Sequence, residues 1–288
     1  MNRFPFLALT SIVLFVSITV AAAEPAVFSG VLTATWGDPM QGDEGISPTV
    51  FHLTEENGAT HRLAIDPALL RMVGGQQNVV GRLGRVTATT EGPTQSVLLI
   101  EKVGSAQSTR GIAGSQPWVS VMCKFSDVAT EPRDQTFFLE MFDNAPGRLD
   151  HYWREVSYGI IDIVGSTAAG WVVLPHNQDH YIPVPGQGCL DGDDTNDADL
   201  GALFTDCTAA ADHLIDYSNG GNPFVGINLM FNSDLDGCAW GGGWSATLDG
   251  VSKIWRTTWE PPWGYGLSLI HISEPTRPPV ASRMPSSA

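Results

Sequence analysis

A short stretch of small, polar residues divides this chain into two halves with different patterns. It runs from Gly104 to Gly114 and shows no hydrophobic periodicity, which is typical of a linker. Before it, from residue 26 to 103, apolar residues fall in short strand-like runs. After it, from residue 115 to 266, strand-like and helix-like runs alternate. We therefore expect an α+β protein, in which a small all-β domain precedes a mixed α/β domain.

The first half has the element order of an OB-like β-barrel. A short helix, 67–73, begins at Pro67 with Asp66 as its cap, and Asn57-Gly58 predicts a hairpin turn. Three strands before the helix and two after it make up the OB-like order. Few basic residues, and Trp36 as the only large aromatic platform, argue against nucleic-acid binding, so we expect an accessory or pro-domain. The expected strands are 27–36, 49–54, 61–65, 79–90 and 96–103.

The second half predicts helices and strands in alternation. Leu149, Tyr152, Trp153 and Val156 recur at helical spacing and predict an amphipathic helix with these residues toward the core. Asp249-Gly250 predicts a tight hairpin turn. Expected helices are 132–142, 149–156 and 197–215, and expected strands are 118–125, 160–164 paired with 171–174, 225–231, 245–248 and 253–258.

Both ends of the chain differ in character from the two halves. An apolar run from Phe4 to Val20, followed by Ala21-Ala22-Ala23, predicts a secretory signal peptide of residues 1–23, in preference to a retained membrane anchor. Residues 267–288 begin with Leu-Ser-Leu-Ile-His-Ile-Ser-Glu-Pro-Thr-Arg, which reads as a translated sequencing-library adapter. We expect this tail to be an artefact and the natural protein to continue; a genuine polar tail is the alternative.

Charge and cysteine content favour an extracellular protein. The chain has 31 acidic and 15 basic residues, a formal net charge of −16, which argues against nucleic acid or an anionic membrane as partner. An even number of cysteines in a secreted chain predicts disulfides. Cys189 and Cys207 are close in sequence and flank an acidic loop, so we expect them to pair. Cys123 and Cys238 would then form the second bond, with two free buried thiols as the alternative.

The acidic loop between Cys189 and Cys207 is a candidate calcium site. It offers the oxygen ligands that calcium prefers, but it lacks the glycine and glutamate of an EF-hand. The alternative is a solvated loop that caps the following helix. The candidate ligands are Asp191, Asp193, Asp194, Asp197 and Asp199.

Two pairs of residues of metal-ligand type lie four residues apart in the sequence. His151 and Glu155 lie one turn apart on a predicted helix and could form half a metal site, although a solvent-facing pair is the expected outcome. His176 and His180 are also four residues apart, but the prolines and asparagine around them predict a loop or strand. In that conformation the spacing does not bring the two side chains together.

A tryptophan-rich segment surrounds Gly241-Gly242-Gly243. Aromatic side chains beside glycines could stack on sugars, which raises the possibility of a carbohydrate-binding module. Strand alternation turns part of the set inward, so we expect a core of large side chains instead. The tryptophans are Trp240, Trp244, Trp255, Trp259 and Trp263.

Three segments carry a resemblance to a known family. They are Asp-His-Tyr-Trp-Arg-Glu-Val-Ser-Tyr-Gly at 150–159, Gly-Ile-Asn-Leu-Met-Phe-Asn at 226–232, and Trp-Arg-Thr-Thr-Trp-Glu-Pro-Pro-Trp-Gly-Tyr at 255–265. Together they resemble the front half of secreted zinc metallopeptidases of the gametolysin type, over residues 116–265. The resemblance implies a zincin-like half-domain, a protein or peptide substrate, and hydrolysis by zinc-activated water.

The sequence differs from that family in its catalytic motif. The family's zinc-binding His-Glu-x-x-His is absent from the chain. We therefore expect this polypeptide to be inactive and to lack the catalytic zinc that the complete protein would hold. One alternative is a secreted carbohydrate- or protein-binding adhesion module with a calcium-stabilised loop, and another is a catalytically dead relative of the family.

Overall fold

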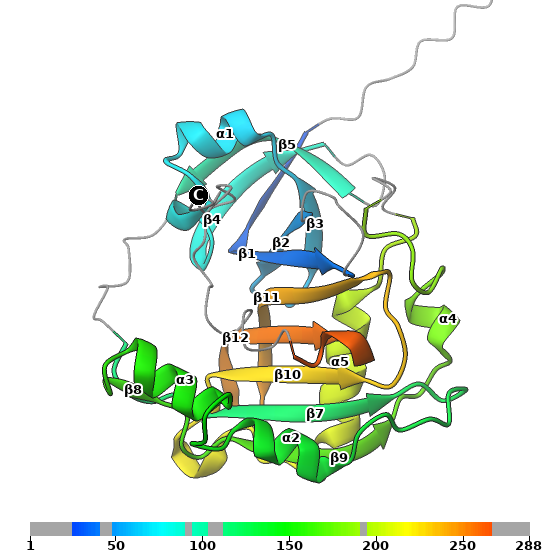
Figure 1. Cartoon of the computed structure of the whole chain (residues 1–288). Coiled ribbons are helices and arrows are strands. Elements are labelled where there is room, and N and C mark those ends of the chain that lie inside the picture. Colours follow the sequence, from blue (N-terminus) through cyan, green and yellow to red (C-terminus); the bar gives the residue numbers. More distant parts are fainter. Residues whose placement is uncertain (1–24, 41–47, 90–93, 103–111, 191–194, 267–288) are drawn as a thin grey trace, which may run out of the picture.

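The computed structural model describes residues 25–40, 48–89, 94–102, 112–190 and 195–266 (Figure 1). The expected signal peptide, most of the expected linker and the expected artefactual tail lie outside these residues. Among the helices of the described part, none is both long and apolar enough to cross a bilayer.

The first five strands close into a barrel in the predicted element order. Each strand pairs with the next in the order β1–β2–β3–β5–β4–β1, with β3 and β5 parallel and the other pairs antiparallel. The helix α1 begins at Pro67, and its Asp66 cap accepts the Ala68 N–H at 2.6 Å, as predicted. The elements are β1 (Ala26–Pro39), β2 (Thr49–Glu55), β3 (Thr60–Ala64), α1 (Pro67–Met72), β4 (Arg82–Ala88) and β5 (Thr94–Lys102).

The fourth barrel strand begins later than predicted. A 3₁₀ turn, η1 (Gln76–Asn78), precedes it, and Val79 follows that turn rather than joining the ladder. Val79 is nonetheless 4% exposed and packs in the barrel core. Its apolar character therefore reflects burial at a turn, which a strand-like composition cannot distinguish from burial in a strand.

The second half builds a five-stranded mixed sheet in the order β11–β12–β10–β7–β9. The pairs β12–β10, β10–β7 and β7–β9 are parallel, while β11 runs antiparallel to β12. Its strands are β7 (Trp118–Lys124), β9 (Thr167–Val173), β10 (Gly226–Phe231), β11 (Cys238–Leu248) and β12 (Val251–Glu260), and two short strands, β6 (Gly114–Ser115) and β8 (Ile161–Asp162), pair separately.

Helices cover both faces of this sheet (Figure 1). On one face, α5 packs on the larger apolar cluster, which includes Phe231, Trp255 and Trp259. On the other face, α2 and α3 pack on a smaller cluster around Phe138 and Met230. The remaining elements are α2 (Gln135–Met141), α3 (Leu149–Val156), α4 (Gln178–Tyr181), α5 (Leu200–Ala211) and the 3₁₀ turns η2 (Asn219–Gly221) and η3 (Pro262–Gly264).

The helix expected at 149–156 has those bounds in the structure, whereas the helices expected at 132–142 and 197–215 are shorter and start later, at side-chain caps. The Asp134 carboxylate accepts the Phe137 N–H at 2.9 Å and starts α2, so Pro132 lies before the helix. Asp199 does the same for α5, where it accepts the Ala202 N–H at 2.8 Å. Leu214, which falls within the helix expected at 197–215, lies beyond the end of α5 and is 50% exposed.

The inward face of α3 also differs from the amphipathic prediction. Leu149 is 1% exposed as expected, but Tyr152 and Val156 are 36% and 47% exposed. Asp150 is instead buried at 4% exposure, where its carboxylate accepts the Ile163 N–H at 2.8 Å. The helix is therefore anchored by a polar contact that apolar periodicity cannot reveal.

The expected pairing of 160–164 with 171–174 is wrong. The first segment contributes β8, which pairs with β6, and the second forms part of β9, which pairs in parallel with β7. Gly165 lies between them with φ 90°. The chain therefore passes from one sheet to another here and makes no hairpin.

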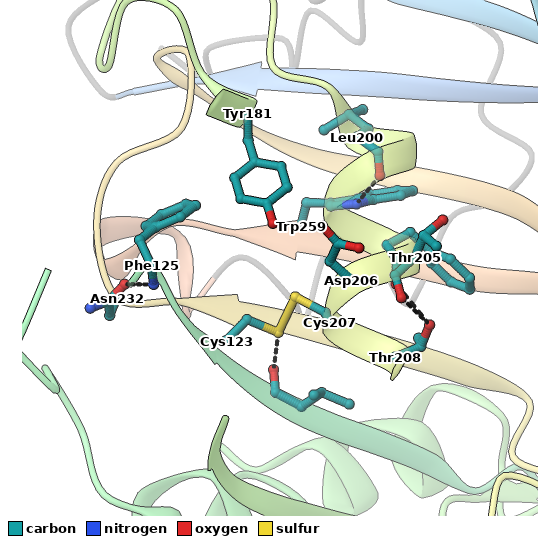
Figure 2. The surroundings of a disulfide bond; sticks show 12 residues. Cys123, Phe125, Tyr181, Leu200, Thr205, Asp206, Cys207, Thr208, Asn232 and Trp259 are labelled. Carbon is teal, nitrogen blue, oxygen red and sulfur yellow. Dashed lines mark hydrogen bonds between the residues drawn. A yellow bond between two sulfur atoms is a disulfide. The ribbon is translucent and has the colours of Figure 1, made fainter. Parts of the chain in front are cut away.

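Both expected disulfide pairings are wrong, although all four cysteines are bonded. Cys123 pairs with Cys207 and Cys189 pairs with Cys238, with Cα–Cα distances of 5.8 and 6.0 Å. Figure 2 shows the first bond, which fastens α5 to β7 across the larger apolar cluster. Proximity in sequence misleads because α5 carries Cys207 away from the acidic loop and onto the sheet.

Candidate functional site at the junction of the two halves

One long strand joins the barrel to the mixed sheet. The first part of β1 pairs with β4 and its middle with β2, whereas Thr35–Pro39 pairs with β11. The pair Thr35–Gly242 lies in this junction. A Cβ atom on Gly242 would lie 2.3 Å from the Ala34 carbonyl oxygen, so glycine is required for the two backbones to approach. The two halves expected on either side of the linker thus share a continuous ten-stranded sheet.

A cavity of about 430 Å³ lies beside this junction. The barrel contributes residues of β2 and β3, and the mixed domain contributes β11 and the beginning of α5. Pockets between domains are common ligand sites in proteins. The lining residues are Val50, His52, Thr60, Arg62, Asp197, Ala198, Asp199, Leu200, Gly201, Trp240 and Trp244.

His52 is the most perturbed group of the cavity. Its ring meets the Trp244 ring edge-on with 5.1 Å between the centroids, and its buried Nδ1 has no hydrogen-bond partner. Burial, and secondarily the Arg62 charge, lower the pKa of His52 from 6.5 to about 4. The imidazole is therefore neutral at physiological pH, and the cavity has a buried group that resists protonation.

An ion pair crosses the cavity from the barrel to the loop before α5. The Arg62 guanidinium on β3 donates to the Asp197 carboxylate. Asp236 fixes the same loop to β11, because its carboxylate accepts both the Ala198 N–H at 2.9 Å and the Trp240 indole N–H at 2.9 Å. Burial raises the pKa of Asp236, and the hydrogen bonds oppose that effect. The loop thus acts as a fixed wall of the cavity.

The proposed calcium ligands divide between this wall and undescribed residues. Asp197 pairs with Arg62, and Asp199 caps α5, so both carboxylates serve structural contacts. Asp191, Asp193 and Asp194 lie outside the described residues. The calcium site stays a prediction.

Most of the tryptophans form a core, as expected from strand alternation. Trp240, Trp255 and Trp259 are 2%, 0% and 0% exposed. The Trp259 indole N–H donates to the Leu200 carbonyl at 3.0 Å, which fixes the start of α5 on the sheet. Trp244 is half-buried between this core and His52, and it is the tryptophan that lines the cavity.

Glu260 is a functional candidate that sequence reasoning missed. It is 0% exposed at the end of β12, and neither carboxylate oxygen makes a hydrogen bond of normal geometry, although the nearby Thr258 hydroxyl opposes part of the rise in the Glu260 pKa. Burial, followed by the charge of Asp38 on β1, raises the pKa of Glu260 well above its ordinary value. Its neighbours Thr258 and Asn228 continue a polar row across the sheet through a 3.1 Å hydrogen bond. No signal in the local pattern marks a buried carboxyl of this kind.

The pairs His151–Glu155 and His176–His180 differ in how their side chains are arranged. His151 and Glu155 face solvent with 3.9 Å between Nε2 and Oε2, the expected solvent-facing arrangement. His176 and His180, expected to lie apart, have ring centroids only 4.0 Å apart. The chain turns between the two residues: Asn177 caps the short helix α4, and its carbonyl accepts the His180 N–H at 3.2 Å, so His180 folds back beside His176.

The described residues do not fit a catalytic zinc of the implied kind. Nowhere among them do three or more His, Cys, Asp or Glu side chains gather closely enough to hold a metal ion. A catalytic zinc needs three protein ligands and an open position. Comparison of the sequence with protein-family models and with curated proteins finds no match.

Proposed function

We propose that this chain carries the front part of a secreted zinc-dependent endopeptidase, with an OB-like barrel as its accessory or pro-domain. The observation that carries the proposal is the convergence of the three segments that resemble the gametolysin type. Trp153 of α3 packs against the core cluster that contains Met230 of β10 and Tyr265. The Tyr265 hydroxyl donates to the Phe231 carbonyl, and β10 pairs with β12. Segments far apart in the chain therefore support one another, as parts of one domain would.

The position of the barrel supports a role in latency. An open sheet edge binds extended polypeptides through its backbone, and β11 would be such an edge without the barrel. Residues Thr35–Pro39 of β1 occupy it through antiparallel pairing. A barrel held there would compete with any extended substrate for the same backbone groups.

Zinc, once bound, would supply the activated water that attacks the peptide carbonyl. The residues described here would contribute the sheet and the covered edge. The zinc ligands are not among them. Two disulfides and the predicted signal peptide support secretion.

The test is to determine the genomic DNA or an independently prepared transcript beyond the codon for Gly266. We expect the reading frame to continue and to encode His-Glu-x-x-His within a few dozen codons. The extended protein should bind one zinc per chain and cleave a protein substrate, and replacing the motif glutamate by glutamine should abolish cleavage. A stop codon or a polar tail at that point would overturn the proposal.

The cavity at the junction favours a second candidate, a carbohydrate- or protein-binding module. Trp244 offers an aromatic surface, and Arg62 and Asp199 offer charged hydrogen-bonding groups. Titration of the chain with neutral oligosaccharides, followed by tryptophan fluorescence, tests this candidate. Saturable quenching that Trp244→Ala removes would support it, whereas an unchanged spectrum would count against it.

A further inference from the structure

His176 and His180 lie together on the surface of the mixed domain. Their ring centroids are 4.0 Å apart with an interplanar angle of 32°, and both residues are exposed. Tyr181 packs against both rings from the buried side, at 6.0 and 5.0 Å. The two imidazoles therefore form a pair with one side against the protein and the other open to solvent.

The backbone that carries the pair is fixed at several points. The His176 carbonyl accepts the Ser126 N–H at 3.2 Å, and the Gln178 N–H donates to the Asp127 carboxylate at 2.9 Å. The Gln178 side chain donates to the Asp234 carbonyl at 2.6 Å, and the His180 N–H donates to the Asn177 carbonyl at 3.2 Å. These contacts anchor the backbone on both sides of the pair. The site is thus preorganised for a ligand that uses both rings.

We propose that His176 and His180 bind a borderline divalent cation such as Zn²⁺. Imidazole nitrogens lie about 2.0–2.1 Å from zinc in tetrahedral sites, which places two nitrogens on one ion roughly 3.3 Å apart. Rings whose centroids are 4.0 Å apart reach this spacing by rotation of the side chains alone. Two histidines leave positions for water or for a ligand from another molecule, so the site is open.

The surrounding charge favours a cation. Asp179 lies between the two histidines in sequence, and Asp127 and Asp234 belong to the segments that hold α4. Asp206 lies behind Tyr181, whose hydroxyl donates to it at 2.6 Å. Lys124, the cation on the neighbouring strand β7, pairs with Glu131 at 2.5 Å. Within a chain of net charge −16, this surface attracts positive ions and offers nitrogen ligands that select among them.

The experiment is a calorimetric titration of the chelator-stripped chain with Zn²⁺, Cu²⁺, Ca²⁺ and Mg²⁺, each as a simple salt. We expect saturable Zn²⁺ binding, with Cu²⁺ tighter as the usual divalent order requires, and no competition from Ca²⁺ or Mg²⁺. His176→Ala and His180→Ala should each weaken Zn²⁺ binding at least about tenfold. Nuclear magnetic resonance of the imidazole protons should show both rings shifting with zinc.

Two matched controls keep the result interpretable. His151→Ala removes an exposed histidine that is paired one turn away with a carboxylate, and His213→Ala removes an exposed histidine on another surface. Both should leave Zn²⁺ affinity unchanged, and all four variants should keep the far-ultraviolet circular dichroism of the parent. Unchanged affinity in both His176→Ala and His180→Ala, or displacement of Zn²⁺ by Ca²⁺, would overturn the proposal. The site uses no residue of the proposed peptidase segments, so the outcome is independent of that function.

Discussion

Thr35 of the barrel pairs with Gly242 of the mixed domain, and a Cβ atom on Gly242 would stand 2.8 Å from the Thr35 Cα. A Cβ atom there would also lie 2.3 Å from the Ala34 carbonyl oxygen. Both the Ala34 oxygen and the Thr35 Cα are backbone atoms, so neither can move aside by a side-chain rotation. The junction therefore depends on a residue without a side chain.

Replacing Gly242 by alanine should loosen the junction. The added methyl group forces β1 away from β11, at a cost on the order of 1–3 kcal/mol. Chemical unfolding measures the loss of stability, and limited proteolysis should cut more rapidly near residues 35–40. Gly170→Ala is the control, because a Cβ atom on Gly170 in β9 would meet nothing within 4 Å. Equal stability of the two variants would contradict the junction described here.

Acid should weaken the protein through His52. Because the folded-state pKa is lowered from 6.5 to about 4, the unfolded state takes up the proton first. The stabilisation is complete above pH 6.5 and is lost as the pH falls toward 4, by up to about 3 kcal/mol. Urea unfolding at a series of pH values from 7 to 4 measures the free energy of unfolding. This free energy should fall less with decreasing pH in His52→Gln than in the parent chain. His213→Gln, which changes an exposed histidine, should leave the pH dependence of the free energy of unfolding as it is in the parent chain.

Glu260→Gln should stabilise the protein at neutral pH. Since the folded-state pKa is raised, the carboxyl stays protonated in the fold while the unfolded chain ionises above its ordinary pKa of 4.5. The parent chain therefore loses stability as the pH rises from 4.5 toward the raised value. The amide keeps the shape and cannot ionise, so the gain in unfolding midpoint should grow as the pH rises above 4.5. A gain that does not change with pH would indicate another cause.

The disulfide connectivity predicts a specific peptide map. Proteolysis without reduction should yield a peptide joining Cys123 to Cys207 and another joining Cys189 to Cys238. Cys123→Ser with Cys207→Ser should lower the free energy of unfolding by about 2–4 kcal/mol, because the bond closes a long loop. Detection of Cys189 linked to Cys207 by mass spectrometry would refute this arrangement.

Asp150→Ala should destabilise α3. The change leaves the buried Ile163 N–H without its 2.8 Å acceptor, at a cost of about 1–3 kcal/mol, and also removes the 2.7 Å contact to Arg154. Glu155→Ala is the control on the same helix, because its side chain is 75% exposed, and it should change stability by less than about 0.5 kcal/mol. Thermal unfolding of both variants tests the difference.

Local chemistry accounts for the parts of the fold that could be predicted. Pro67 after Asp66 starts α1, and Asp249-Gly250, with φ 47° and 76°, turns β11 into β12. The strictly buried strand β10 also matches its apolar run. These signals involve only a few neighbouring residues, so they can be recognised in the sequence without knowledge of the tertiary structure. The candidate site was recovered only in part: Trp244 and Asp197 were singled out, but His52 and Glu260 were not.

The sequence by itself determined the element order of the barrel, the acidic character of the chain and the positions of turns such as Asp249-Gly250, because propensity, capping and charge are properties of neighbouring residues. Only the tertiary structure decided which cysteines pair with each other, where β1 leaves the barrel to pair with β11, and which titratable groups are buried away from solvent. Those outcomes depend on which side chains the packed sheets bring together. Contacts between segments far apart in the chain leave no local pattern, and His52 and Glu260 owe their perturbed pKa values to such contacts.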